Sequence, residues 1–107
     1  MANVLIHQFD VFANPHPERA GEFPFVLVLQ SDWVSNTSSV IVAPLVPTDR
    51  ERQARLYPHF EVEGRHLVAA VSDLAAIPRA VLSNPVANVS SERDRIIAAL
   101  DLLFTGY

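Results

Sequence analysis

The sequence has no cysteine and no lysine, and its 107 residues include only three glycines and one tryptophan. Without cysteine, the chain cannot form a disulfide, a thiolate zinc site or a cysteine nucleophile, and a reducing cytoplasm suits it. Three scattered glycines leave no glycine-rich loop for a phosphate group. We therefore expect a cytoplasmic protein and exclude several classes of cofactor and nucleophile chemistry.

Long apolar runs are also missing. No stretch of eighteen apolar residues occurs, so we expect no membrane-spanning helix and no membrane partner. The first seven residues have neither a basic region nor a cleavage site, so they do not predict a secretory signal. A chain of 107 residues fits one domain, placed over residues 1–107, and a core of this modest size would gain stability from oligomerisation.

The charge of the chain argues against nucleic acid as a direct partner. All eight basic residues are arginine, the net charge is −4 and the isoelectric point is about 5.4. The densest basic group, Arg50, Arg52 and Arg55, is interleaved with Asp49 and Glu51. Binding to phosphates normally requires a continuous basic patch. A protein partner suits this balance better.

Residues 91–107 form the longest helical pattern of the sequence. Ser91 is the predicted N-cap, Asp94 stands where a capping box has its acidic residue, and Gly106 provides a stop. An apolar face recurs at helical spacing, which predicts that the helix packs on a core. It consists of Ile96, Leu100, Leu103 and Tyr107, with Ile97 and Phe104 beside them.

The rest of the chain predicts short strands. We expect strands at 3–12, 25–30 and 40–43, a hairpin of 60–63 and 66–71 around Gly64, and a last strand within 85–89. Pro44 and Pro47 should end the third strand, and residues 72–78 should form a 3₁₀ segment. About five strands and one helix predict a mainly β protein, a small barrel or sandwich with a C-terminal α-helix.

No pattern of residues predicts catalysis, a metal site or a cofactor. The histidines are not at metal-ligand spacing, no nucleophile elbow surrounds a serine, and Glu61 and Glu63 fit a solvated strand face. The four histidines are His7, His16, His59 and His66.

Three aromatic residues allow two interpretations. Trp33 follows the turn-prone pair Ser31-Asp32, so it either packs in the core or forms an exposed anchor of the kind enriched in interface hot spots. Phe104 and Tyr107 allow the same two interpretations. A small sheet cannot bury every apolar residue at the end of the helix, so self-association or a partner groove is the natural outlet.

Several short segments in order along the chain match one family. The chain resembles the CcdB family, the toxins of plasmid-type toxin–antitoxin pairs. Each matching segment is weak by itself, and their order and spacing make the resemblance specific. The segments are Gln8-Phe9 with Val11, then residues 29–32, 42–45, 56–58, 73–78, 86–90 and 102–107.

The resemblance implies a fold and a function. The fold is an SH3-like barrel of the CcdB/MazF type with a C-terminal helix, assembled as a homodimer. The toxin binds the A subunit of DNA gyrase and traps the gyrase–DNA cleavage complex, so it inhibits a topoisomerase and is not itself an enzyme. A CcdA-like antitoxin neutralises the toxin, and the complex of the two represses transcription of their operon. The toxin would thus meet operator DNA only through the antitoxin.

The resemblance also implies which residues meet gyrase. Trp33 and Val34 stand where the family has aliphatic contact residues, Asp101 replaces an asparagine, and Phe104 is unchanged. The family tail Trp-Gly-Ile corresponds to Thr105-Gly106-Tyr107, in which only the glycine is kept. The expected gyrase-binding residues are therefore Trp33, Val34, Asp101, Phe104, Thr105, Gly106 and Tyr107.

Two other functions remain open at this point. One is a MazF-type endoribonuclease toxin, which shares the barrel and would use an arginine from the loop of Arg50, Arg52 and Arg55 against phosphate charge. The other is a CcdB-like module that still binds the antitoxin but no longer poisons gyrase.

Overall fold

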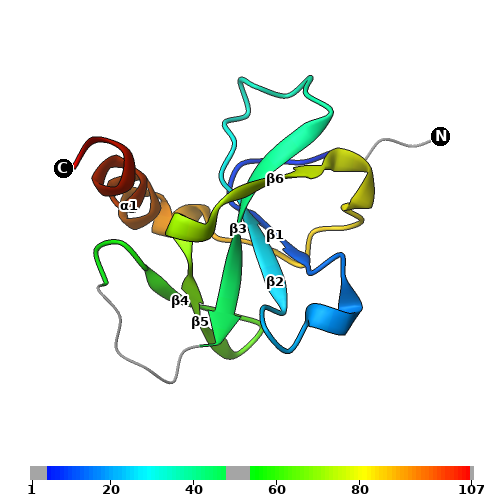
Figure 1. Cartoon of the computed structure of the whole chain (residues 1–107), viewed down its shortest axis with the longest axis horizontal. Helices are drawn as coiled ribbons and strands as arrows, with labels where there is room; N and C mark the ends of the chain where they lie inside the picture. The colour runs from blue at the N-terminus through cyan, green and yellow to red at the C-terminus, as the bar shows by residue number, and fades with distance from the viewer. Residues whose placement is uncertain (1–4, 48–53, 107) are drawn as a thin grey trace.

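The computed structural model describes residues 5–47 and 54–106 of the chain (Figure 1). In these ranges it contains seven strands, one α-helix and four short 3₁₀ turns. The strands are β1 Asp10–Ala13, β2 Phe25–Val28, β3 Ser39–Pro47, β4 His59–Val62, β5 Arg65–Ala69, β6 Ala75–Pro78 and β7 Ala87–Asn88. The helix α1 spans Arg93–Thr105, and the turns are η1 Pro17–Arg19, η2 Val71–Asp73, η3 Arg79–Val81 and η4 Ser90–Glu92.

The strands form one antiparallel sheet that bends into a nearly closed barrel (Figure 1). Its order is β4-β5-β3-β2-β1-β7, and β6 adds to β3. The prediction of a mainly β, barrel-like fold with a C-terminal helix is confirmed, although the described residues hold seven strands instead of about five. The expected homodimer stays a prediction. None of the helices in the described ranges has the length and apolar character to cross a membrane.

Strand β3 continues through Pro44, where the sequence predicted its end. The strand changes partner at this point, because residues up to Val42 pair with β6 and residues from Leu45 pair with β5. The carbonyl of Pro44 accepts a hydrogen bond from the amide of Ala70, so its nitrogen faces the gap between these two partners. The missing N–H therefore removes no ladder hydrogen bond, and a proline is tolerated inside a central strand.

The first strand is shorter than expected because a turn precedes it. The amide of Asp10 donates to the carbonyl of His7, and Phe9 within this turn has a φ of 71°. A bulky residue adopts a positive φ at a cost, which is offset here because Phe9 is buried in the core. The carboxylate of Asp10 is buried and accepts hydrogen bonds from the His7 amide and from Asn88 Nδ2, both at 2.9 Å. The turn therefore fastens β1 to β7.

The predicted hairpin is confirmed as β4 and β5. Val62 and Arg65 pair across a two-residue turn, in which Glu63 has a φ of 51° and Gly64 a φ of 75°. Two positive φ angles in succession are the mark of the type I′ turn, whose twist matches that of the flanking strands.

The hairpin turn allows a matched test of backbone strain. An added Cβ meets no atom within 4 Å at either Gly64 or Gly21, but only Gly64 has a positive φ. We expect Gly64→Ala to lower the free energy of unfolding by about 1 kcal/mol. Gly21→Ala should change it by less than about 0.5 kcal/mol. Urea denaturation of both variants measures this, and equal effects would contradict the role assigned to φ.

Other elements refine the sequence prediction. The segment predicted as 3₁₀ is only partly so, because η2 is followed by β6, which pairs with β3 from Ser39 to Val42. Strands β2 and β7 lie within the ranges predicted for them.

The start of the helix differs from the prediction, and its end agrees with it. The 3₁₀ turn η4 precedes α1, so Glu92 instead of Ser91 occupies the N-cap position, and its side chain makes no capping hydrogen bond. The predicted Ser91 cap and capping box are therefore wrong. Gly106 has a φ of 82° and donates its amide to the Leu102 carbonyl, which confirms the predicted stop.

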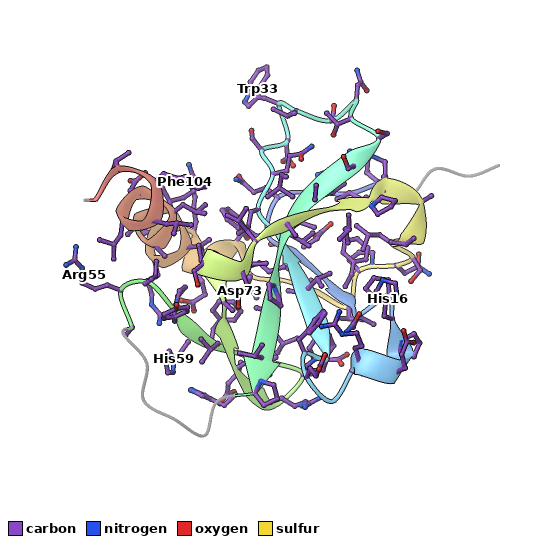
Figure 2. The ribbon with its side chains drawn as sticks, viewed as in Figure 1. His16, Trp33, Arg55, His59, Asp73 and Phe104 are labelled. Atoms are coloured by element: carbon purple, nitrogen blue, oxygen red, sulfur yellow. The ribbon has the colours of Figure 1, made fainter. Side chains whose placement is uncertain are left out.

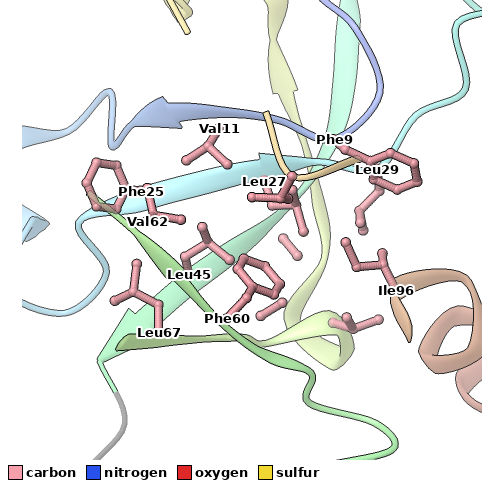
Figure 3. Close-up of a cluster of buried hydrophobic side chains, with 14 of the residues drawn as sticks. Phe9, Val11, Phe25, Leu27, Leu29, Leu45, Phe60, Val62, Leu67 and Ile96 are labelled. Atoms are coloured by element: carbon pink, nitrogen blue, oxygen red, sulfur yellow. The ribbon is translucent and has the colours of Figure 1, made fainter. Parts of the chain in front are cut away.

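The main core lies inside the barrel and includes one face of α1 (Figure 3). Ile96 and Ala99 are buried there, while Leu100 and Leu103 are partly buried and pack against the same cluster. A second apolar cluster covers the other face of β2 and β3, so both faces of these strands are apolar. Its buried members are Phe12, Val26, Val28, Val40, Val42 and Leu82.

Candidate functional site

The segment between β2 and β3, here called the Trp33 loop (residues 30–38), carries the most exposed of the large apolar side chains described. Trp33 is 94% exposed, and Val34 beside it is 49% exposed. Figure 2 shows Trp33 at the tip of the loop, pointing away from the barrel. Of the two interpretations of Trp33, the structure rules out packing in the core, and the role of the exposed side chain as an anchor stays a prediction.

Gln30 holds this loop from its base. Its Nε2 donates to the carbonyl of Val34 at 2.6 Å and to Thr37 Oγ1 at 2.7 Å. Its Oε1 accepts the amide of Ile41 at 3.1 Å, so one side chain joins the loop to strand β3. The backbone of the loop is thereby ordered although it contains no helix or strand from residue 30 to residue 38.

The Ser31-Asp32 pair forms the turn that presents Trp33. The amide of Trp33 donates to Ser31 Oγ at 3.1 Å, and the amide of Val34 donates to the Ser31 carbonyl at 2.9 Å. Asp32 Oδ1 accepts the amide of Gln8 at 2.8 Å, which ties the loop to the turn before β1. The polar groups of this turn are used within the protein, and the apolar side chains of Trp33 and Val34 are left outside.

The second group of predicted site residues lies at the end of α1. Asp101, Phe104, Thr105 and Gly106 are all exposed, and Phe104 is 69% exposed. Thr105 Oγ1 donates to the Asp101 carbonyl at 2.7 Å, so its hydroxyl is satisfied inside the helix. Among the described residues at this end, the exposed apolar side chain is that of Phe104. Tyr107 lies outside the described residues.

Trp33 and Phe104 belong to separate elements, the Trp33 loop and α1 (Figure 2). No ring contact joins the two within the described ranges. Six large apolar side chains are strongly exposed in the described ranges, and three of them are predicted site residues. The six are Leu5, Trp33, Val34, Val81, Val86 and Phe104. Half of the strongly exposed large apolar side chains in the described ranges are therefore predicted site residues, and they lie on two separate elements.

A groove of about 470 Å³ lies elsewhere, on the second apolar cluster. Its floor includes Val26, Val42 and Ile77, and its rim includes His16 and Asp73. It is a mostly apolar surface with a polar edge, the usual character of a binding groove. Neither Trp33 nor Phe104 lines it.

Titratable residues do not gather into a metal-binding cluster in the part of the chain that the structure describes. The four histidines are spread over the first turn, the segment before η1 and the β4–β5 hairpin. His59 and His66 form an edge-to-face ring pair with centroids 5.8 Å apart. The side chains of His7 and His16 lie 3.8 Å from Asp32 and 3.7 Å from Glu18, respectively.

The arginine group weighed for a ribonuclease is only partly described, because Arg50 and Arg52 lie outside the described residues. Arg55 is exposed and lines a hollow of about 270 Å³ with Arg95 of α1. Ala54 and Ala98 complete the described lining. The described part of this hollow thus consists of two alanines and two arginines, of which Arg95 is paired with Glu92 at 2.6 Å.

Comparison with known proteins identifies the family. A search of curated proteins finds no match to this sequence. The family model of the CcdB protein matches residues 8–106, a range that includes every predicted site residue except Tyr107. Since the match covers nearly the whole chain and the barrel with its C-terminal helix agrees with it, the chain belongs to the CcdB family.

Proposed function

We propose that this protein is the toxin of a type II toxin–antitoxin module, which binds the A subunit of DNA gyrase and traps the gyrase–DNA cleavage complex. Family membership over residues 8–106 supports the class of protein. The observation that carries the proposal is the 94% exposure of Trp33, at a position where the family resemblance expects a contact with gyrase. Phe104 is the second exposed residue at such a position.

An exposed tryptophan is a strong potential contact because its apolar area has not been used in folding. A Trp side chain buries on the order of 150–250 Å² when it enters a pocket, and such residues dominate interface hot spots. Trp33 makes no hydrogen bond through its indole within the described residues, so a partner can cover it without breaking one.

The distribution of aromatic residues supports the same surface. The family resemblance expects an indole at position 105 and aliphatic residues at positions 33 and 34. This chain has Thr105 and the single tryptophan at position 33 instead. The indole missing from the tail is thus present in the loop, and we infer that Trp33 takes over as the main aromatic anchor, with Phe104 in support.

The same proposal covers the partners of the toxin. A CcdA-like antitoxin would remove the toxin from gyrase, and the two together would repress their operon. The net charge of −4 gives the toxin alone little attraction to operator DNA, so contact with DNA would pass through the antitoxin. Homodimer formation and action in the cytoplasm belong to the same proposal.

A gyrase cleavage assay tests the proposal. Purified protein, gyrase, ATP and supercoiled plasmid should yield linear DNA after detergent and protease treatment. A chain ending at Phe104 should yield at least tenfold less linear DNA, because it lacks three of the predicted gyrase-binding residues, Thr105, Gly106 and Tyr107. Equal melting temperatures of the two chains are the control.

Three outcomes separate the candidate functions. Cleaved DNA supports the gyrase poison. Absence of cleaved DNA, together with tight binding of the antitoxin, would favour the module that binds without poisoning. Degradation of a mixed RNA substrate by the purified protein would favour the MazF-type ribonuclease.

A further inference from the structure

Arg79, the first residue of η3, is tied to the Trp33 loop by three hydrogen bonds. Its Nε donates to the Thr37 carbonyl at 3.0 Å, and its Nη2 donates to the Ser35 carbonyl at 3.0 Å. Its backbone amide donates to the Ser38 carbonyl at 2.8 Å. The side chain is half-buried at this place. One residue therefore holds the returning half of a loop that lies more than 40 positions earlier in the sequence.

These contacts matter because the carbonyls of Ser35 and Thr37 belong to irregular backbone. Neither residue lies in a strand or helix, so no ladder orders them. A guanidinium group donates along two fixed directions, and hydrogen bonds from a charged donor are stronger than those from a neutral one. Arg79 can thus fix the spacing of the Ser35 and Thr37 carbonyls, whereas Gln30 contacts this stretch through the Val34 carbonyl and the Thr37 hydroxyl.

The position of Trp33 depends on both halves of the loop backbone, the Ser31-Asp32 turn before it and the returning segment that Arg79 holds. Its indole is exposed and forms no hydrogen bond in the described part of the chain, so no side-chain contact of that kind locates the ring. Gln30 ties the loop to β3, and Arg79 ties it to η3, which follows β6. Without the side chain of Arg79, the carbonyls of Ser35 and Thr37 would have only water as a hydrogen-bond partner.

We propose that Arg79 is a positioning residue for target binding, which keeps the Trp33 loop in the one conformation that presents Trp33 to gyrase. This inference rests on the proposed function. When only a fraction of molecules hold the binding conformation, the apparent dissociation constant rises in inverse proportion to that fraction. A loop ordered before binding also loses less conformational freedom when the complex forms.

The single tryptophan makes the loop directly observable. Time-resolved fluorescence anisotropy of the free protein reports the motion of Trp33 without interference from another indole. We expect Arg79→Gln to increase the amplitude of the nanosecond depolarisation. Arg79→Lys should give an intermediate amplitude, because an ammonium keeps the charge but cannot span two carbonyls as a fork. An unchanged amplitude in Arg79→Gln would overturn the proposal.

The matched control is Arg19→Gln. Arg19 is also an arginine at a 3₁₀ turn, but its Nε donates to Glu22 Oε2 just after that turn and makes no bond to the Trp33 loop. The control should leave the depolarisation of Trp33 unchanged. Melting temperatures of all three variants show whether the barrel itself is intact, and Arg79→Lys provides the comparison if Arg79→Gln does not fold.

Binding to the purified gyrase A subunit is the second measurement. We expect Arg79→Gln to raise the dissociation constant about tenfold and Arg79→Lys about threefold, with no change in Arg19→Gln. A loop that loosens while the affinity stays at the wild-type value would overturn the proposal. If the wild-type protein itself fails to bind, the proposed function is wrong. The anisotropy measurement would then still decide whether Arg79 holds the loop.

Discussion

Replacement of Trp33 by alanine is expected to weaken binding to the gyrase A subunit about thirtyfold or more. A central aromatic anchor contributes about 2 kcal/mol or more to an interface, and 1.4 kcal/mol corresponds to a factor of ten. The free protein should keep its stability, since a side chain that is 94% exposed contributes little to folding. Isothermal titration calorimetry with the purified subunit measures the affinity.

Phe104→Ala should weaken binding by a smaller factor, because the ring is smaller than an indole and is already one-third covered. Residues that do not touch have additive effects, so the double variant should lose the product of the two single factors, on the order of a hundredfold or more. Val81→Ala is the matched control, because Val81 is exposed and apolar but lies outside the predicted site. If Trp33→Ala binds like the wild type, the contact surface lies elsewhere.

Ile96→Ala should be the most destabilising single change on α1. The side chain is fully buried between the helix and the barrel, where Figure 3 shows it pointing into the core. Deleting a buried aliphatic side chain costs about 2–5 kcal/mol, a large part of the roughly 5–15 kcal/mol that stabilises a typical domain. Urea denaturation of purified protein measures the loss.

Ile97→Ala is the control for that measurement. Ile97 is the neighbouring residue on the same helix, it is only partly buried, and the substitution changes helix propensity by the same amount. We expect it to cost about 1 kcal/mol. Equal losses in the two variants would show that the helix does not dock through Ile96.

The sequence correctly predicted the elements that are determined by residues adjacent in the chain. Gly64 and Gly106 have the positive φ angles expected of a hairpin turn and a helix stop, and each is set by its immediate neighbours. The helix was predicted because apolar residues recur at helical spacing from Ile96 to Tyr107. These features depend on short-range sterics and periodicity, which a single sequence displays directly.

The errors concern features that depend on distant parts of the chain. Pro44 is tolerated inside β3 because two partner strands meet opposite its nitrogen, and both come later in the sequence. Residues 72–78 were predicted as a 3₁₀ segment and their alanines have little strand preference, yet Ala75–Pro78 forms β6 by pairing with β3. Ser91 is of a residue type that is common at N-caps. The 3₁₀ turn η4 includes Ser91, however, so the helix begins after it.

In the candidate site, too, features set by neighbouring residues could be predicted from the sequence, and features set by distant residues could not. The composition of the turn at Ser31-Asp32 made Trp33 a candidate, but only the fold determines that its side chain faces solvent. Arg79 gave no signal at all, because its two acceptors lie 42 and 44 positions away and are backbone carbonyls. Residues that hold a binding loop through its backbone leave no pattern in a single sequence.

The pairing of β1 with β7 has a consequence for how the protein is made. Asp10 and Val11 pair with Asn88 and Ala87. A strand near the start of the chain can therefore complete its pairing only after a strand near the end has been synthesised. During synthesis the barrel cannot close, and Ile96 cannot enter the core, until those later residues have left the ribosome. A chain interrupted before β7 would therefore carry the Trp33 loop on an open sheet, without the helix that bears Phe104. We expect such a truncated product to be recognised as unfolded and degraded before it can act on a target.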